Sequence, residues 1–265
     1  MERLKWYDPI WAAFMFFTRL PLWRWHEPPV DAFRRVVEWW PLVGWFSGAI
    51  MATVLYASSF VFPYPVAILL AIVARMLLTG ALHEDGLADF FDGFGGGRGQ
   101  RERILSIMKD SHIGSYGVLA LALYLAILFF SLYSICCPLH AALVVLVADP
   151  YAKMLSAQFV SMLPYARTEE TAKSHVVYRR LTVWAGICLA VQGLLPLAVF
   201  LWLVDKELSY WYPFVFVPAL TMYFLYLYVK KRIQGYTGDC CGAVFLLSEL
   251  SFVLVASVLF AGAAV

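Results

Sequence analysis

Seven apolar stretches, each long enough to cross a bilayer, constrain the fold of this chain more than any other feature. A helix needs about 20 apolar residues to cross roughly 30 Å of hydrocarbon. An eighth stretch, from Ile10 to Leu20, is too short to cross and predicts an interfacial or re-entrant helix. We therefore expect an all-α polytopic membrane protein, with residues 1–265 as a single integral-membrane domain. The seven long stretches are residues 41–62, 64–82, 113–136, 140–163, 181–204, 210–229 and 240–262.

Charged residues are too scarce for a soluble surface. They make up 14% of the chain, and hydrophobic residues make up 62%, whereas soluble domains are about 25% charged. The expected surroundings are therefore a lipid bilayer. The net charge of +2 gives no basis for a nucleic-acid partner.

The basic residues predict the orientation of the chain. Seventeen of the 20 lysines and arginines fall in alternate connections, whereas the intervening connections hold only Lys206. Because cytoplasmic loops of membrane proteins are enriched in basic residues, we expect a cytoplasmic N-terminus in a multi-pass protein of the cell membrane. The basic segments are residues 1–40, 83–112, 164–180 and 230–239.

Four acids follow the second apolar stretch within nine residues: Glu84, Asp85, Asp89 and Asp92. If this segment is helical, its three aspartates fall within about 60° of arc. Clustered carboxylates repel one another unless a cation lies between them, and oxygen ligands favour Mg²⁺, with Mn²⁺ as an alternative. We predict that these four acids hold a metal ion, although acidic runs are more often solvated loops.

Basic and glycine-rich residues follow the acids directly. Arg98 and Arg101, within a run of glycines, can neutralise phosphate charge. Lys109 is expected to face phosphate, and Asp110 to act as a further metal ligand or a general base. Ser111 is equally well explained as the N-cap of the next helix. Acids, arginines and exposed backbone amides together are typical of phosphoryl transfer.

Charges also occur within the apolar stretches. Asp149 and Lys153 are four residues apart, so either they pair on one helix or Lys153 extends toward the phosphate site. The glycines around Asp239, at the start of the last stretch, predict a close approach to a ligand.

Four stretches follow one another along the chain: Phe17-Thr18-Arg19-Leu20-Pro21, His83-Glu84-Asp85-Gly86-Leu87-Ala88-Asp89 with Asp92-Gly93, residues 107–117, and Thr237-Gly238-Asp239 with Gly242-Ala243 and Glu249. In this order they resemble the cobalamin synthase family, the adenosylcobinamide-GDP ribazoletransferases. Tyr165-Ala166-Arg167 also fits the family. The chain departs from the family pattern at Glu84, where leucine is common, at Phe90 and Phe91, where smaller residues are usual, and at Lys153, where arginine is usual.

The resemblance implies a Mg²⁺-dependent membrane enzyme acting on small corrinoid and nucleoside substrates. It would transfer the cobinamide-phosphoryl group of adenosylcobinamide-GDP to α-ribazole, or to its 5′-phosphate, and release GMP. The active site is expected on the cytoplasmic face, in residues 83–117 and 230–242, and a homo-oligomer is compatible with it. The catalytic candidates are Asp110, Asp239 and Lys109; the substrate-binding candidates are Arg98, Arg101, Ser111, Lys153, Thr237 and His83; the metal candidates are Asp85, Asp89, Asp92 and Glu84.

Two alternatives remain, one among enzymes and one from another class of protein. Asp89-Phe90-Phe91-Asp92-Gly93 matches the D-x-x-D-G start of CDP-alcohol phosphotransferases, but Gly96 and Gly97 stand where that pattern continues with Ala-Arg. A transporter could use Arg75, Asp149, Lys153 and Glu249 as a pathway. The transporter is disfavoured because the other acids gather near one end of a span and no internal repeat is evident.

Overall fold

The computed structural model describes residues 4–167, 177–204 and 211–261. Helices are the only regular elements in these ranges, apart from an isolated parallel bridge between Tyr165 and Tyr236. The all-α class predicted from the sequence is confirmed. Arg3, Lys173 and Lys206, which contributed to the predicted orientation, lie outside the described residues. The side of the membrane that the N-terminus faces stays a prediction.

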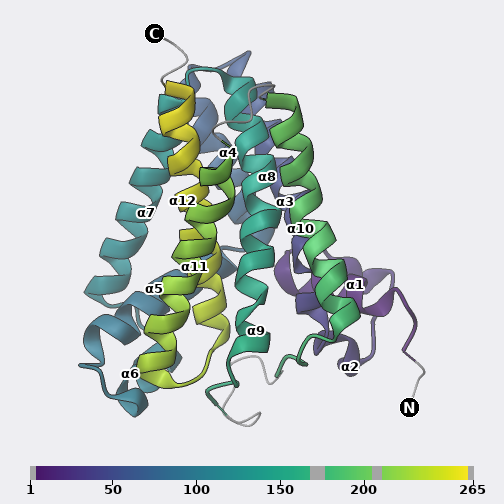
Figure 1. The fold of residues 1–265 in the computed structure, drawn as a ribbon, viewed down its shortest axis with the longest axis vertical. Coiled ribbons are helices and arrows are strands. Elements are labelled where there is room, and N and C mark those ends of the chain that lie inside the picture. Colours follow the sequence, from purple (N-terminus) through teal and green to yellow (C-terminus); the bar gives the residue numbers. More distant parts are fainter. Residues whose placement is uncertain (1–3, 168–176, 205–210, 262–265) are drawn as a thin grey trace.

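Six helical segments in the described part are long and apolar enough to cross a membrane, or seven if a bent pair of helices counts as one span. This confirms the predicted set of about seven spans. Figure 1 shows the long helices side by side as one bundle. The six are α3 (Trp40–Ser59) with the 3-10 helix η2 (Val36–Trp39), α7 (Ser115–Ser134), α8 (Pro138–Ala157) with α9 (Phe159–Met162), α10 (Val183–Val204), α11 (Tyr212–Ile233) and α12 (Gly238–Ala261).

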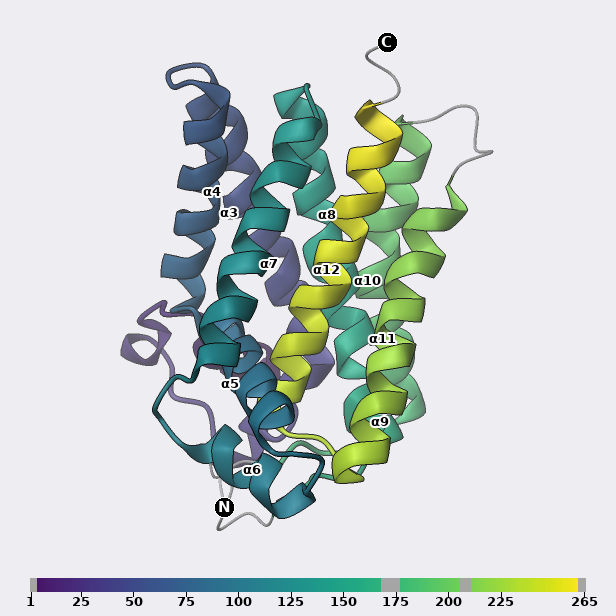
Figure 2. The same cartoon turned by 90° about the vertical axis from the view of Figure 1, so that its left-hand side faces the viewer.

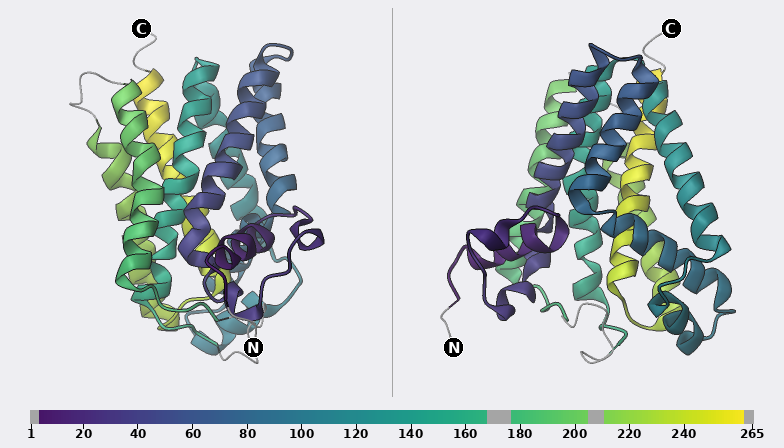
Figure 3. Two further views of the ribbon diagram at one scale, coloured as in Figure 1. Left: turned by 90° about the vertical axis from the view of Figure 1, so that its right-hand side faces the viewer. Right: turned by 180° about the vertical axis from the view of Figure 1, so that it is seen from behind.

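The N-terminal segment packs across one end of the bundle as short helices. Its longest helix, α1 (Asp8–Phe17), has ten residues and is too short to cross a bilayer. Figure 3 shows α1 lying across the lower part of the bundle. The predicted short helix before the first span is confirmed, with shifted ends. Two further short elements follow, η1 (Leu22–Arg24) and α2 (Val30–Phe33).

The bent pair consists of α4 (Tyr64–Thr79) and α5 (Leu82–Gly96), whose axes differ by 89°. Gly80 and Ala81 both adopt left-handed backbone conformations, with φ of 65° and 55°, and these end α4 and redirect the chain. Figure 2 shows α5 and α6 (Arg101–Lys109) beneath the lower ends of α4 and α7. The acidic segment is therefore helical, as its spacing requires, but it does not continue the direction of α4.

The centre of the bundle is α8, which packs against α3, α10, α11 and α12. The helix α3 approaches it closely through glycine. A Cβ atom added to Gly44 would lie only 2.7 Å from the Cα of Pro150, and one added to Gly48 would lie 3.0 Å from the carbonyl oxygen of Leu146. Small residues at such positions allow two helix backbones to approach in a bilayer.

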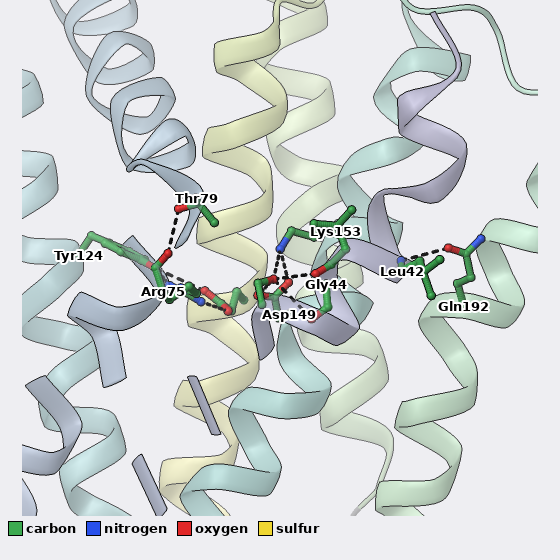
Figure 4. Close-up of polar contacts among 11 residues, drawn as sticks. Leu42, Gly44, Arg75, Thr79, Tyr124, Asp149, Lys153 and Gln192 are labelled. Carbon is green, nitrogen blue, oxygen red and sulfur yellow. Dashed lines mark hydrogen bonds and ion pairs between the residues drawn. The ribbon is translucent and has the colours of Figure 1, made fainter. Parts of the chain in front are cut away.

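Lys153 and Asp149 form an ion pair inside this contact (Figure 4). The Nζ of Lys153 also donates to the Oγ of Ser47 on α3, at 2.8 Å, and that hydroxyl donates to Asp149 at 2.8 Å. All three side chains are 1% exposed or less. The pairing interpretation of Asp149 and Lys153 is confirmed, and the pair joins α8 to α3.

A second buried ion pair joins Arg75 of α4 to Glu249 of α12. Arg75 also donates to the hydroxyl of Tyr124 on α7, at 3.0 Å (Figure 4). A charge inside a bilayer is costly unless it is paired. These contacts pair the charges of the apolar stretches, and they connect neighbouring helices.

Candidate functional site

The four acids of α5 lie in different surroundings. Asp85 is exposed and Asp89 half-buried, whereas Glu84 and Asp92 are 4% and 7% exposed. Glu84 interacts electrostatically with Arg75 in the bundle, and its Oε2 has no hydrogen-bond partner among the described residues. Within residues 4–167, 177–204 and 211–261, no three His, Cys, Asp or Glu side chains are grouped to hold a metal ion. The four predicted ligands therefore do not converge on one point.

Asp92 caps the start of α7. Its Oδ2 accepts a hydrogen bond from the backbone N–H of Gly114, at 2.7 Å, and its Oδ1 accepts one from Gly117, at 2.9 Å. A Cβ atom at either glycine would lie 2.4 Å from a carboxylate oxygen of Asp92. The helix N-terminus favours the negative charge. In the structure this predicted metal ligand holds α5 against α7.

A cavity of about 140 Å³ lies where α1, α3, α5 and α12 meet. Asp85 of α5 and Asp239 of α12 both line it, together with Arg167, which follows α9. The two helices are in close contact here, since a Cβ atom on Gly86 would lie 3.2 Å from the Cα of Asp239. The cavity therefore brings two carboxylates and a guanidinium together from three distant parts of the sequence.

Aromatic rings form another part of the cavity lining. Phe17 stacks on Trp40 with 5.0 Å between ring centroids, and the His83 ring lies 5.6 Å from that of Trp40. Trp40 and His83 are 2% and 4% exposed. The Nε1 of Trp40 and the Nε2 of His83 have no hydrogen-bond partner in the described part of the chain. Buried polar atoms are normally paired, and these two nitrogens belong to residues that line the cavity.

Two tyrosines also line the cavity. Burial raises the pKa of both Tyr165 and Tyr178. Both phenols are therefore neutral at physiological pH, and they add hydroxyl groups rather than further negative charge beside Asp239.

Two arginines connect the segment after α9 to α6 and to the end of α11. Arg101 donates from Nε to the carbonyl oxygen of Ile233, at 2.9 Å, and from Nη2 to that of Ala166, at 3.0 Å. Arg167 donates to the carbonyl oxygen of Leu105, at 2.9 Å, and also lines the cavity. Arg101, predicted to bind substrate, thus positions the segment that carries Arg167. Arg167 was not among the predicted site residues, although the Tyr165-Ala166-Arg167 resemblance pointed to it.

Thr237 and Lys153, both predicted to bind substrate, contact other parts of the protein. The Oγ1 of Thr237 accepts a hydrogen bond from the N–H of Cys240, at 3.3 Å, as a cap at the start of α12. The Nζ of Lys153 lies 4.4 Å from the ring centroid of Phe245, which in turn packs against His83 at 4.8 Å. Neither Thr237 nor Lys153 lines the cavity.

The remaining candidates lie between α5 and α7 and are exposed: Arg98, Lys109, Asp110 and Ser111. None of these four lines the cavity. Asp110 pairs with the Nδ1 of His112 at 2.7 Å. This hydrogen bond lowers the pKa of Asp110 and raises that of His112. The substrate and catalytic roles of these residues stay predictions.

Comparison with known proteins places this architecture in a family. A model of the cobalamin-5-phosphate synthase family matches residues 9–257. A relative from Shewanella baltica, named adenosylcobinamide-GDP ribazoletransferase, is 34% identical over 254 residues, which cover 94% of each chain. Relatives with the same name from Shewanella frigidimarina and Leptospira interrogans are 33% and 30% identical, over 95% and 92% of this chain and 96% and 92% of their own. No solved structure matches the chain.

Proposed function

The chain belongs to the cobalamin-5-phosphate synthase family, and from this premise we propose that it is an adenosylcobinamide-GDP ribazoletransferase. It transfers the cobinamide-phosphoryl group to α-ribazole or to α-ribazole 5′-phosphate. A P–O bond to the acceptor forms, the pyrophosphate bond to GMP breaks, and the attacking hydroxyl loses its proton. Because the second acceptor is already phosphorylated at its 5′ position, the nucleophile shared by both is a hydroxyl on the ribose ring.

The observation that carries this proposal is the meeting of Asp85, Asp239 and Arg167 in one cavity. A carboxylate within reach of a hydroxyl can accept its proton, and we assign that role to Asp239. Arg167 offsets negative charge on the transferred phosphoryl group, since guanidinium groups bind phosphate oxygens in a fixed fork geometry.

The oxygen donors of the cavity fit a magnesium ion. Mg²⁺ is commonly bound by one or two carboxylates, with substrate phosphates and water completing its shell. Asp85 supplies one such carboxylate in the cavity, and Asp89 lies one helical turn beyond it on α5. These residues would hold the ion. When bound, it would neutralise charge on the pyrophosphate. Asp92 is less suited because both its oxygens accept backbone hydrogen bonds.

We place this cavity on the cytoplasmic face of the cell membrane. Figure 1 shows α1, α5 and α6 at the lower end of the bundle, where the C-terminal end of α11 also lies. The described parts of the basic segments that predict the cytoplasmic side belong to this end, and an active site there would meet water-soluble corrinoid and nucleoside substrates directly.

The experiment is an assay of GMP release by the full-length protein purified in detergent. With adenosylcobinamide-GDP, α-ribazole and Mg²⁺, we expect one GMP for each corrinoid product. Omitting α-ribazole or adding EDTA should stop release. GMP formed at the same rate without α-ribazole would indicate hydrolysis and would contradict the transfer reaction.

Variants test the assignment to the cavity. Asp239→Asn should lower kcat by about 10²- to 10⁴-fold, the range expected when a general base is lost, and Asp85→Asn should raise the Mg²⁺ concentration needed for half-maximal rate. Glu102→Gln is the matched control, because the Glu102 side chain is 85% exposed on α6. It should behave as the wild type, and all three variants should keep the wild-type melting temperature within a few degrees.

A further inference from the structure

The proposed reaction uses the charged residues of the cavity and leaves its aromatic side without a role. We call this side the aromatic wall and define it as Phe17, Trp40, His83 and Tyr178, all of which line the cavity. The rings come from α1, α3, α5 and the segment before α10. Two polar atoms of the wall, the Trp40 Nε1 and the His83 Nε2, lack partners among the described residues.

We propose that the aromatic wall is the subsite for the benzimidazole base of the acceptor nucleoside. The inference rests on the proposed function, because the acceptor is identified through it. Phe17 and Trp40 stack on each other, 9° from parallel, and a flat bicyclic base can extend this stack from the outer face of one ring. Aromatic pairs of this kind contribute beyond the area that they bury.

The wall offers few polar atoms, and this favours the benzimidazole base of the acceptor over the guanine base of the donor. Guanine, in the donor, carries several donors and acceptors around its edge, each of which needs a partner when buried. A benzimidazole nucleoside has one free ring nitrogen, an acceptor, and its outer edge is apolar. The Trp40 N–H is the matching donor. The His83 Nε2 would then form a hydrogen bond with a ribose hydroxyl.

The position of the wall also suits this occupant. His83 lies two residues before Asp85 on α5, and a Cβ atom on Gly242 of α12 would lie 3.3 Å from the carbonyl oxygen of His83. The wall therefore adjoins the carboxylates of both α5 and α12. A base held by the wall places its ribose beside Asp85 and Asp239, where the attacking hydroxyl must be.

The experiment compares Trp40→Phe with Trp39→Phe. Both replacements keep an aromatic ring and remove a buried indole N–H that has no partner among the described residues, but only Trp40 lines the cavity. Loss of one hydrogen bond to a neutral acceptor should raise the KM for α-ribazole about five- to tenfold in Trp40→Phe. The KM for adenosylcobinamide-GDP should stay unchanged, and Trp39→Phe should leave both values unchanged.

Calorimetric titration of α-ribazole into each protein in detergent gives a readout independent of turnover, with the same five- to tenfold loss expected. If Trp40→Phe melts early, Phe17→Leu replaces it as the test, because it removes a stacking ring and keeps an apolar side chain. A raised KM for the donor with an unchanged KM for α-ribazole would assign the wall to guanine and overturn the proposal. Unchanged values for both substrates would also overturn it.

The same assay distinguishes a failure of the proposed function from a failure of the proposed base subsite. Absence of GMP release by the wild-type protein would contradict the proposed function itself. Normal wild-type release, together with unaltered α-ribazole binding in Trp40→Phe and Phe17→Leu, would contradict the subsite alone.

Discussion

Asp92 joins two helices through one carboxylate. Both of its oxygens accept backbone N–H groups at the start of α7, from Gly114 and Gly117. These N–H groups have no partner within α7, because the first turn of a helix leaves its donors unpaired. The side chain therefore stabilises the position of α5, which also carries Asp85.

Replacing Asp92 by alanine should lower the free energy of unfolding by about 2 kcal/mol, as expected for losing a charged cap with two hydrogen bonds. Asp92→Asn should cost less, because its amide oxygen can still accept one of them. Thermal unfolding in detergent measures both. If Asp92 is instead mainly a metal ligand, both variants will keep the wild-type stability in EDTA and will need a higher Mg²⁺ concentration for half-maximal rate.

Some residues of the cavity can be identified from the sequence one at a time, whereas others cannot. Asp85, Asp239 and His83 are evident because charged or polar groups near spans are costly and therefore informative. Trp40 and Tyr178 are not, since aromatic residues are common throughout this chain. The cap formed by Asp92 depends on contact with α7, 22 residues away along the chain, which helical phasing within α5 does not contain.

At the scale of elements, the turn between α4 and α5 determines where the cavity lies. Gly80 adopts φ of 65°, and a Cβ atom there would lie 2.0 Å from the Nε of Arg19. The backbone N–H of Arg19 donates to the carbonyl oxygen of Leu78, at 2.7 Å. The turn thus fixes the direction of α5 and also the junction of α4 with the chain after α1.

Gly80→Ala should destabilise the protein by about 1–2 kcal/mol, because alanine is disfavoured in the left-handed region, and it should displace Arg19. Since α5 carries Asp85, turnover should fall as well. Gly186→Ala is the matched control: Gly186 lies in α10, and a Cβ atom there would meet nothing within 4 Å. The control should be unchanged or more stable by up to about 1 kcal/mol. Equal melting temperatures for the two variants would argue against a constrained turn.

Hydropathy predicts the helices well because each span must satisfy its own backbone hydrogen bonds in lipid. It does not predict the 89° change of direction after Thr79. That bend depends on two consecutive residues in the left-handed conformation. Glycine, at position 80, adopts this conformation readily, whereas alanine, at position 81, does not.

At the scale of the whole molecule, paired charges hold the bundle together. Arg75 and Glu249 are 174 residues apart in sequence and form a buried pair that joins α4 to α12. Tyr124 adds α7 to the same contact. Asp149 and Lys153 are predictable as partners from their spacing, whereas the pairing of Arg75 with Glu249 requires the fold.

Glu249→Gln should destabilise the protein by about 3–5 kcal/mol, because it leaves the Arg75 charge buried without a carboxylate. The double variant Arg75→Met/Glu249→Leu should be more stable than Glu249→Gln, since both charges are gone. Melting temperatures of these two variants and of the single variants Arg75→Met and Glu249→Leu provide the comparison. A double variant whose loss equals the sum of its single losses would show that the pair is not coupled.

The most direct test of the assignment of phosphoryl transfer to the cavity is the rate of GMP release by Asp239→Asn and Asp110→Asn, measured side by side with folded, purified proteins. If the cavity is the active site, release is lost in Asp239→Asn and retained in Asp110→Asn, whose carboxylate is exposed and outside the cavity. Near-wild-type release by Asp239→Asn with loss in Asp110→Asn would contradict this assignment and would move the reaction to the connection between α6 and α7.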